Sequence, residues 1–149
     1  MVIGIAAHYP EFRAVFGIFT VASLRAVMKI LIADDSRIVR DRLTNLLVEV
    51  DGIEIVGLAE DAAQAKNMAK TLKPHIAILD VRMPEGNGVE VLRDIKRTNP
   101  TSRVIMLTNF VDSESRRMCF DQGADYFFDK SIEFEKVVEV LQGMRHQVS

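Results

Sequence analysis

Two hydrophobic periods alternate along the chain from residue 28 onward. Short apolar runs of strand length, mostly rich in Ile, Val or Phe, are separated by stretches whose apolar residues repeat at helical spacing. The expected strands are 29–33, 53–58, 75–79, 103–107 and 125–128. Parallel strands need crossover connections that are usually helical, so this alternation favours a parallel sheet covered on both faces. The predicted fold class is a doubly wound α/β domain with five strands and five helices.

The pattern supports the five expected helices unequally. The first follows Ser36, a candidate N-cap, and has the clearest apolar face. That face consists of Ile38, Val39, Leu43, Leu46, Leu47 and Val50. The second is expected over about 61–70, the third from about Gly88 to the residue before Asn99-Pro100, and the last from about Glu133. The fourth, over about 112–121, has few apolar residues, so it should be the most loosely held.

The first 27 residues differ from the rest in composition, because their only charged residues are Glu11, Arg13 and Arg25. The uncharged stretch 14–24 is much shorter than the roughly 20 apolar residues of a membrane helix, and the features of a secretory signal are missing. Met28 opens a sequence that is complete in itself. We therefore expect residues 1–27 to be a mispredicted start or a disordered N-terminal extension, and residues 28–149 to form one folded domain. A native intact mass that includes Met1 would refute a start at Met28.

Composition narrows the function classes further. The chain has 149 residues, about the size of one domain, and its 21 acidic and 19 basic residues give a formal charge of −2. No overall basic field exists to attract nucleic acid or anionic lipid, so we expect no direct nucleic-acid or membrane partner. Cys119 is the single cysteine, which excludes an intramolecular disulfide and fits a cytoplasmic protein. A lone thiol of this kind is expected in the core.

Charged and polar side chains follow the expected strands. Asp34-Asp35 comes after the first, Asp80 after the third, Thr108 after the fourth and Lys130 after the fifth. The carboxyl ends of parallel strands meet at one edge of a sheet, where ligands bind near the point at which the strand order reverses. Carboxylates gathered there repel one another. A divalent cation with oxygen ligands, Mg²⁺ or a close substitute, usually offsets this repulsion.

The same residues, in this order and spacing, resemble the receiver domain of response regulators. The matching elements are a strand followed by Asp-Asp, a strand followed by Asp and then by Met83-Pro84, a strand followed by Thr, and an aromatic-x-x-Lys segment. The resemblance covers 28–149 and implies the flavodoxin-like receiver fold. It also implies a phosphorylation-activated response regulator of a two-component system. Nothing after the fifth expected helix could form an output domain, so we expect a stand-alone receiver that signals by binding a partner protein.

The resemblance assigns the acidic residues to a metal and a phosphoryl group. Asp80 would be the phosphoacceptor, supplied by a sensor histidine kinase or a histidine phosphotransfer protein. Asp34, Asp35, Asp80 and the backbone carbonyl of Arg82 would bind Mg²⁺. The chemistry is reasonable because a carboxylate that attacks a phosphoryl group brings one anion to another, and cations must offset that repulsion.

Three further residues would stabilise the phosphoryl group or transmit its presence. Lys130 would lie across the site as a mobile positive charge, and the hydroxyl of Thr108 would hydrogen-bond a phosphoryl oxygen. The Thr108 contact would draw the following loop inward while the aromatic Phe127 changes rotamer. The surface around the fourth helix and fifth strand would change with it and control binding to a downstream target.

The sequence also departs from the family pattern at several positions. Ser131 follows Lys130 where the family usually has proline, often with a cis bond; a cis bond before serine would cost about 3 kcal/mol, so a trans bond is expected. Asn109 stands where a small residue is common. Arg82 and Phe110 flank the expected path of hydrolytic water, so we predict a phosphate lifetime different from that of fast chemotaxis-type receivers.

Several alternatives remain at this point. The chain could be a phosphorelay intermediate or a receiver fragment of a larger regulator. A Mg²⁺-dependent aspartyl phosphatase needs a second acid two residues after the nucleophile, where Arg82 stands, and a nucleotide-binding glycine motif is lacking. We therefore expect a phosphoacceptor domain rather than an enzyme. Charges on the fourth and fifth expected helices could form a homodimer face or an ordinary solvated surface. These are Arg116, Arg117, Glu135, Glu139 and Arg145.

Each site residue taken alone has an ordinary structural explanation. Asp34 or Asp35 could cap a helix, Asp80 could be a turn residue, and Lys130 could be a solvated loop lysine. Thr108 could bond to the backbone at a strand end, and Phe127 could simply be a core residue. The joint occurrence of the acids, Thr108 and Lys130 favours the functional interpretation, whereas a core role and a switching role both stay open for Phe127.

Overall fold

Five parallel strands form one sheet in the order β2-β1-β3-β4-β5. The computed structural model describes residues 27–148, with side chains through residue 145. The strands are β1 (Met28–Ala33), β2 (Ile53–Ala59), β3 (Ile76–Leu79), β4 (Arg103–Thr108) and β5 (Tyr126–Asp129). The chain runs from β1 outward to β2 and then returns to β3 on the other side of β1. The strand order therefore reverses at β1, which confirms the predicted doubly wound class.

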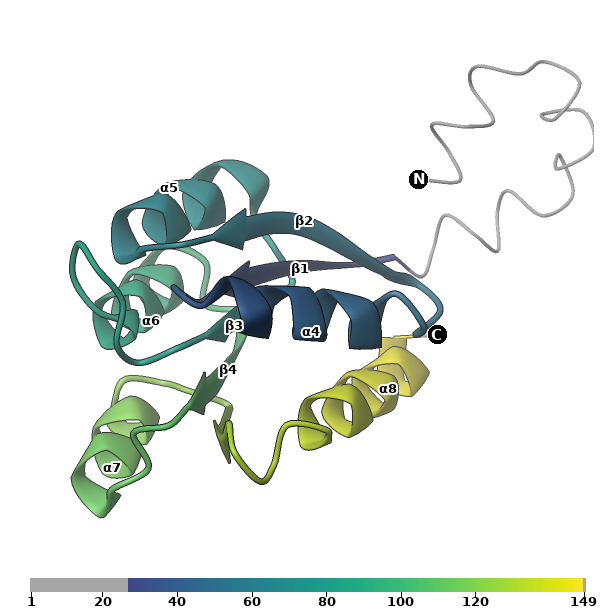
Figure 1. Cartoon of the computed structure of the whole chain (residues 1–149). Coiled ribbons are helices and arrows are strands. Elements are labelled where there is room, and N and C mark those ends of the chain that lie inside the picture. The colour runs from purple at the N-terminus through teal and green to yellow at the C-terminus, as the bar shows by residue number, and fades with distance from the viewer. Residues whose placement is uncertain (1–26, 149) are drawn as a thin grey trace, which may run out of the picture.

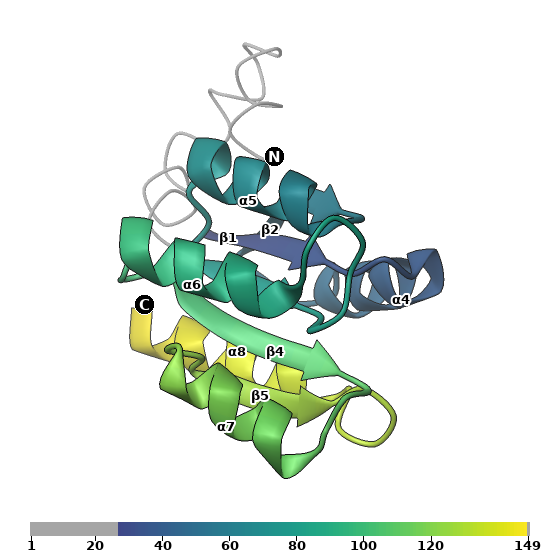
Figure 2. The same cartoon turned by 90° about the vertical axis from the view of Figure 1, so that its left-hand side faces the viewer.

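Helices cover both faces of this sheet. They are α4 (Arg37–Leu47), α5 (Ala62–Leu72), α6 (Gly88–Thr98), α7 (Ser113–Asp121) and α8 (Lys136–Val148). Helices α5, α6 and α7 lie on one face, and α4 and α8 lie on the other (Figure 1). Apolar side chains of each group pack against the sheet. Figure 2 shows α5, α6 and α7 side by side on the first of these faces.

Two hydrophobic cores result, one on each side of the sheet, and the strands contribute alternate residues to them. Along β1, Ile30 and Ile32 belong to the core under α4 and α8, whereas Leu31 and Ala33 belong to the core under α5, α6 and α7. Burial on both faces explains why the strand sequences are continuous apolar runs. Cys119 is fully buried in the second of these cores, as expected, and burial raises the pKa of its thiol.

Polar side chains, rather than the hydrophobic pattern, determine the residue at which several helices begin. Ser36 caps α4 by accepting the backbone N–H of Val39 at 3.3 Å, which confirms that prediction. Asp61 and Asp112 lie one residue outside the helices in which they were expected, and they act as the N-caps of α5 and α7. The helix expected from about Glu133 begins at Lys136; Phe134 and Glu135 form a turn before it, and the side chain of Phe134 is buried.

Helix α7 has the smallest share of buried residues. Its single buried residue is Cys119, while Met118 and Phe120 are 43% and 40% exposed. This agrees with its weak apolar pattern, and its predicted looseness stays a prediction. The expectation for the N-terminal extension lies almost entirely in residues 1–26, outside the described residues. None of the helices within 27–148 has both the length and the apolar content needed to cross a membrane.

Candidate functional site

The ends of three strands carry the predicted acidic and basic side chains to one edge of the sheet. Asp34 follows β1, Asp80 follows β3 and Lys130 follows β5. Each continues the strand pairing by one residue, because each backbone N–H donates to a carbonyl of a neighbouring strand: Ala59 at 3.0 Å, Ala33 at 3.0 Å and Thr108 at 2.9 Å, respectively. The sheet itself thus fixes the backbone from which each functional side chain leaves.

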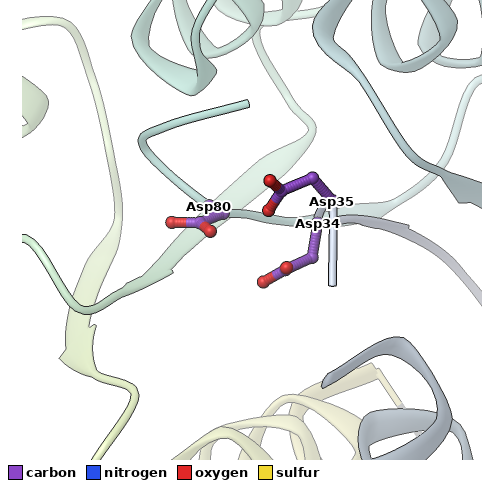
Figure 3. Close-up of side chains that lie close together, drawn as sticks. All are labelled: Asp34, Asp35 and Asp80. Carbon is purple, nitrogen blue, oxygen red and sulfur yellow. The ribbon is translucent and has the colours of Figure 1, made fainter. Parts of the chain in front are cut away.

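Asp34, Asp35 and Asp80 form one acidic cluster, with their side chains grouped between the ends of β1 and β3 (Figure 3). One carboxylate oxygen from each lies within 4.8 Å of the other two. Asp34 is 2% exposed and Asp80 is 6% exposed, whereas Asp35 is exposed. Two of the three carboxylates are therefore buried away from water. Their mutual repulsion is poorly screened in that environment.

A single ammonium group bridges the two buried carboxylates. Lys130 Nζ lies 2.7 Å from Asp34 Oδ2 and 2.9 Å from Asp80 Oδ2, and the lysine side chain is 10% exposed. Burial opposes the charge of Lys130, but the hydrogen bonds and negative charges of Asp34 and Asp80 together raise the pKa of its ammonium. Burial, aided by the charge of Asp80, raises the pKa of Asp34 despite the hydrogen bonds from Lys130 and Ser36.

The second oxygen of Asp80 is not paired. Asp80 Oδ1 is buried and has no hydrogen-bond partner among the residues that the structure describes. A buried carboxylate oxygen without a partner is costly unless a ligand uses it. The donor set consists only of oxygens and is net negative after Lys130 is counted, which is the chemistry that Mg²⁺ requires. The residues present therefore fit the magnesium ion that the sequence predicted.

Arg40 is a supporting residue that the sequence did not reveal. Its Nη1 donates to the backbone carbonyl of Asp34 at 2.7 Å, and its side chain is only 11% exposed. The carboxylate of Asp34 also accepts the backbone N–H of Ser36 at 2.8 Å. These two contacts hold the turn between β1 and α4 that carries the Asp34-Asp35 pair. On the sequence pattern Arg40 was one of several charged residues on the polar face of the helix.

Gly88 is the second residue whose importance the sequence did not show. A Cβ added there would lie 1.8 Å from the backbone oxygen of Asp80, far closer than two non-bonded atoms can approach. The Gly88 N–H also donates to the carbonyl of Val81 at 2.7 Å. Only glycine lets the start of α6 approach the backbone of Asp80 so closely, so Gly88 fixes the loop that begins at Asp80.

A contact between Arg82 and Phe110 links the loops that follow β3 and β4. The guanidinium carbon of Arg82 lies 3.8 Å from the centroid of the Phe110 ring, a cation–π contact. The backbone of Arg82 pairs with Asn87 in an isolated β-bridge. Its assignment as a metal ligand through the carbonyl stays a prediction.

Thr108 and Phe127 occupy buried positions on β4 and β5. Thr108 is fully buried at the end of β4, and its Oγ1 accepts the backbone N–H of Phe110 at 3.1 Å. Phe127 is 3% exposed and packs with Phe120, their ring centroids 6.3 Å apart. The guanidinium carbon of Arg116 lies 5.4 Å from both ring centroids. The predicted switching roles of Thr108 and Phe127 stay predictions, and packing alone also explains the burial of Phe127.

The structure also bears on the expectations for the Lys130–Ser131 bond and for the proposed dimer residues. No cis peptide bond occurs within residues 27–148, so the Lys130–Ser131 bond is trans, as expected. Of the proposed dimer residues, Arg116 lies over Phe120 and Phe127, Glu135 pairs with Arg42 at 3.0 Å, and Arg145 donates to Asp51 O. These contacts are made within the chain, and a homodimer stays a prediction.

The doubly wound sheet thus brings an acidic cluster and a lysine together at the carboxyl ends of its strands. Comparison with known proteins gives the family: the response regulator receiver domain model matches residues 30–142, so this chain belongs to that family. Its members are parts of two-component systems, and phosphorylation and Mg²⁺ binding are typical of them. Receiver domains interact with kinases and downstream partners.

Three similar proteins illustrate the range of this family. The transcriptional regulatory protein LnrK of Bacillus subtilis (strain 168) is 34% identical over 115 residues, covering 77% of this chain and 52% of LnrK. Protein CcdB of the same strain is 34% identical over 113 residues, covering 76% of this chain and 93% of CcdB. The solved CheX-CheY-BeF3-Mg+2 complex from Borrelia burgdorferi has a TM-score of 0.72 at 27% identity, covering 78% of this chain and 88% of that chain. The chain spans about half the length of the first curated relatives that it matches.

Proposed function

We propose that this protein is a phosphorylation-activated response regulator and that Asp80 is its phosphoacceptor. The phosphoryl donor is a phosphohistidine on a sensor histidine kinase or a histidine phosphotransfer protein. The observation that carries this proposal is the environment of Asp80: Lys130 binds one carboxylate oxygen at 2.9 Å, and the other oxygen, buried beside two further carboxylates, has no partner within the described residues. That arrangement is poor for stability and suited to an incoming cation and phosphoryl group.

The transfer follows from the groups at the site. A carboxylate oxygen of Asp80 attacks phosphorus, a new O–P bond forms, the P–N bond to the donor histidine breaks, and its electron pair returns to the imidazole nitrogen. Lys130 is already within reach of Asp80 and can neutralise charge on the transferred group. Mg²⁺, held by Asp34, Asp35, Asp80 and the carbonyl of Arg82, would offset the remaining negative charge when bound.

The phosphorylated state would act through the surface formed by α7 and β5. Thr108 ends β4 and contacts the N–H of Phe110 through its hydroxyl oxygen, so a new contact from this hydroxyl to a phosphoryl group would shift the loop before α7. Phe127, packed with Phe120 of that helix, would move with it. The altered surface would then change affinity for a downstream protein, which makes the chain a signalling domain that promotes only its own phosphorylation and dephosphorylation.

We further propose that this reaction takes place in the cytoplasm and that residues 28–149 form the functional receiver unit. The similar proteins have two different lengths. LnrK is about twice as long as its matched region, whereas CcdB is nearly as long as its matched region. The receiver chemistry is the same in both. The intact mass of the native protein distinguishes a stand-alone regulator or relay intermediate from the receiver part of a longer one.

The direct test is incubation with acetyl phosphate and Mg²⁺, followed by measurement of acid-labile phosphate on the protein. Wild type should acquire the adduct, and Asp80→Asn should not, because the amide cannot act as the nucleophile. Chelation of Mg²⁺ should suppress the adduct in wild type. Asp121→Asn, which changes an exposed acid at the end of α7, serves as the matched control and should behave as wild type. Equal labelling of Asp80→Asn and wild type would refute the proposal.

A further inference from the structure

The turn that carries Lys130 away from β5 is built differently from the usual family pattern, in which proline follows the lysine. On its N-terminal side Lys130 is anchored by its backbone N–H, which donates to Thr108 O at 2.9 Å. On its C-terminal side stands Ser131, which does not restrict the backbone as proline does. Another group must therefore hold the chain on that side if the ammonium is to reach Asp34 and Asp80.

The carboxylate of Asp129 supplies that restraint. Its Oδ1 accepts the backbone N–H of Ser131 at 2.8 Å and the Ser131 hydroxyl at 2.6 Å. The side chain of Asp129 thus spans Lys130 and closes an Asx-type turn with Lys130 at its centre. Both hydrogen bonds lower the pKa of Asp129, so the carboxylate is ionised and a strong acceptor at neutral pH.

A second pair of contacts fixes Asp129 itself. Its backbone N–H donates to Glu133 Oε1 at 3.1 Å, and its carbonyl accepts the backbone N–H of Glu133 at 2.8 Å. Lys136 Nζ in turn lies 2.8 Å from Glu133 Oε2. The turn is therefore tied to the first residue of α8 and cannot shift without breaking several bonds at once.

We propose that Asp129 is a positioning residue for Lys130, replacing with two hydrogen bonds to Ser131 the restraint that proline gives in related receivers. Asp129 is outside the acidic cluster of Asp34, Asp35 and Asp80. It acts on the phosphoacceptor only through the backbone from which Lys130 leaves. The role in phosphorylation rests on the proposed function, whereas the placement of Lys130 does not.

The first experiment compares initial rates of phosphorylation by acetyl phosphate with Mg²⁺. Asp129→Ala removes both acceptors and should slow the reaction about tenfold or more, which corresponds to about 1.4 kcal/mol of activation free energy. Asp129→Asn keeps a side-chain oxygen that can accept the same two bonds and should stay within about threefold of wild type. This rescue by the amide is a result that loss of charge alone would not give.

The chain offers a closely matched control on another loop. Asp112 also accepts the backbone N–H and the hydroxyl of one serine, Ser115, both at 2.9 Å, but the residues between them, Ser113 and Glu114, belong to α7 and have no role in the site. Asp112→Ala should phosphorylate within about twofold of wild type. An Asp129→Ala rate equal to that of Asp112→Ala would overturn the proposal, and so would an Asp129→Asn rate as low as that of Asp129→Ala.

A second measurement needs no phosphorylation. Lys130→Met leaves Asp34 and Asp80 without their shared cation and should lower the urea midpoint of the unphosphorylated protein. If Asp129 places Lys130, that loss should be smaller in an Asp129→Ala background, because part of the bridge is already lost there. Additive midpoint shifts would overturn the inference. Failure of wild type to accept phosphate would refute the proposed function alone, and the urea cycle would still decide the role of Asp129.

Discussion

The side chains of the site carry more negative than positive charge. One ammonium group pairs with two buried carboxylates, and a third carboxylate lies beside them. Asp34 and Asp80 both bond to Lys130, and Asp80 retains a buried oxygen without a partner among the described residues. Such an arrangement lowers stability unless a ligand completes it. The same excess of negative charge supports our proposal that the site binds a cation and accepts a phosphoryl group.

The contact between Arg82 and Phe110 leads to a prediction about phosphate lifetime. The two side chains belong to the loops that follow β3 and β4, with the Arg82 guanidinium carbon 3.8 Å from the Phe110 ring centroid, and they would restrict the approach of water to a phosphorylated Asp80. Alanine at either position should shorten the lifetime several-fold. The double variant should be little worse than each single variant, because both remove the same contact. Decay of acid-labile phosphate over time gives the measurement.

Asn109 provides the control for that series, since it lies between Thr108 and Phe110 and is not part of the stacked pair. Asn109→Ala tests whether any change in this loop alters the decay. An unchanged lifetime in the Arg82→Ala, Phe110→Ala double variant would show that the stacked pair does not control hydrolysis.

Much of the element-level organisation was predictable, because strands buried on both faces and amphipathic helices leave clear periods in the sequence. The order of the acids and lysine at strand ends then predicted their convergence. What the sequence could not show were contacts between backbone and side chain in the loops. The approach of Gly88 to Asp80, the bond from Arg40 to Asp34 and the Asp129 turn depend on loop conformation rather than on periodicity. The late start of α8 has the same cause.

The start of α6 allows a sharp test of the loop after Asp80. Gly88→Ala would force a methyl group against the backbone oxygen of Asp80, and backbone atoms there cannot rotate away. We expect a loss of about 2 kcal/mol or more in the free energy of unfolding, together with slower phosphorylation. Urea unfolding monitored by circular dichroism measures the first effect.

Gly143 in α8 is the matched control, because a Cβ there would meet nothing within 4 Å. Gly143→Ala should stabilise the protein by up to about 1 kcal/mol through the helix propensity of alanine. A Gly88→Ala protein as stable as wild type would contradict the close approach of α6 to Asp80.

At the scale of the whole molecule, the reversal of strand order at β1 brings residues 34, 80 and 130 together although they are far apart in sequence. Metal binding at that point should therefore be coupled to folding. Mg²⁺ at one hundred times its dissociation constant should add about 2.7 kcal/mol to the free energy of unfolding of wild type and so raise its urea midpoint. Asp34→Asn and Asp80→Asn should each remove most of this gain.

Two controls separate site binding from a general salt effect. NaCl at equal ionic strength should not reproduce the gain, and Asp121→Asn should retain it, since Asp121 lies at the end of α7 and outside the acidic cluster. Equal stabilisation of wild type and the Asp80→Asn variant by Mg²⁺ would argue against a metal site at this cluster.

The most direct measurement identifies the residue that carries the phosphoryl group. Wild-type protein treated with acetyl phosphate and Mg²⁺ can be reduced with borohydride, which converts an acyl phosphate into a stable alcohol, and then digested and sequenced by mass spectrometry. The account predicts modification at Asp80, abolished when Mg²⁺ is chelated. Modification confined to another residue, or none under conditions in which a known receiver is labelled, would contradict it.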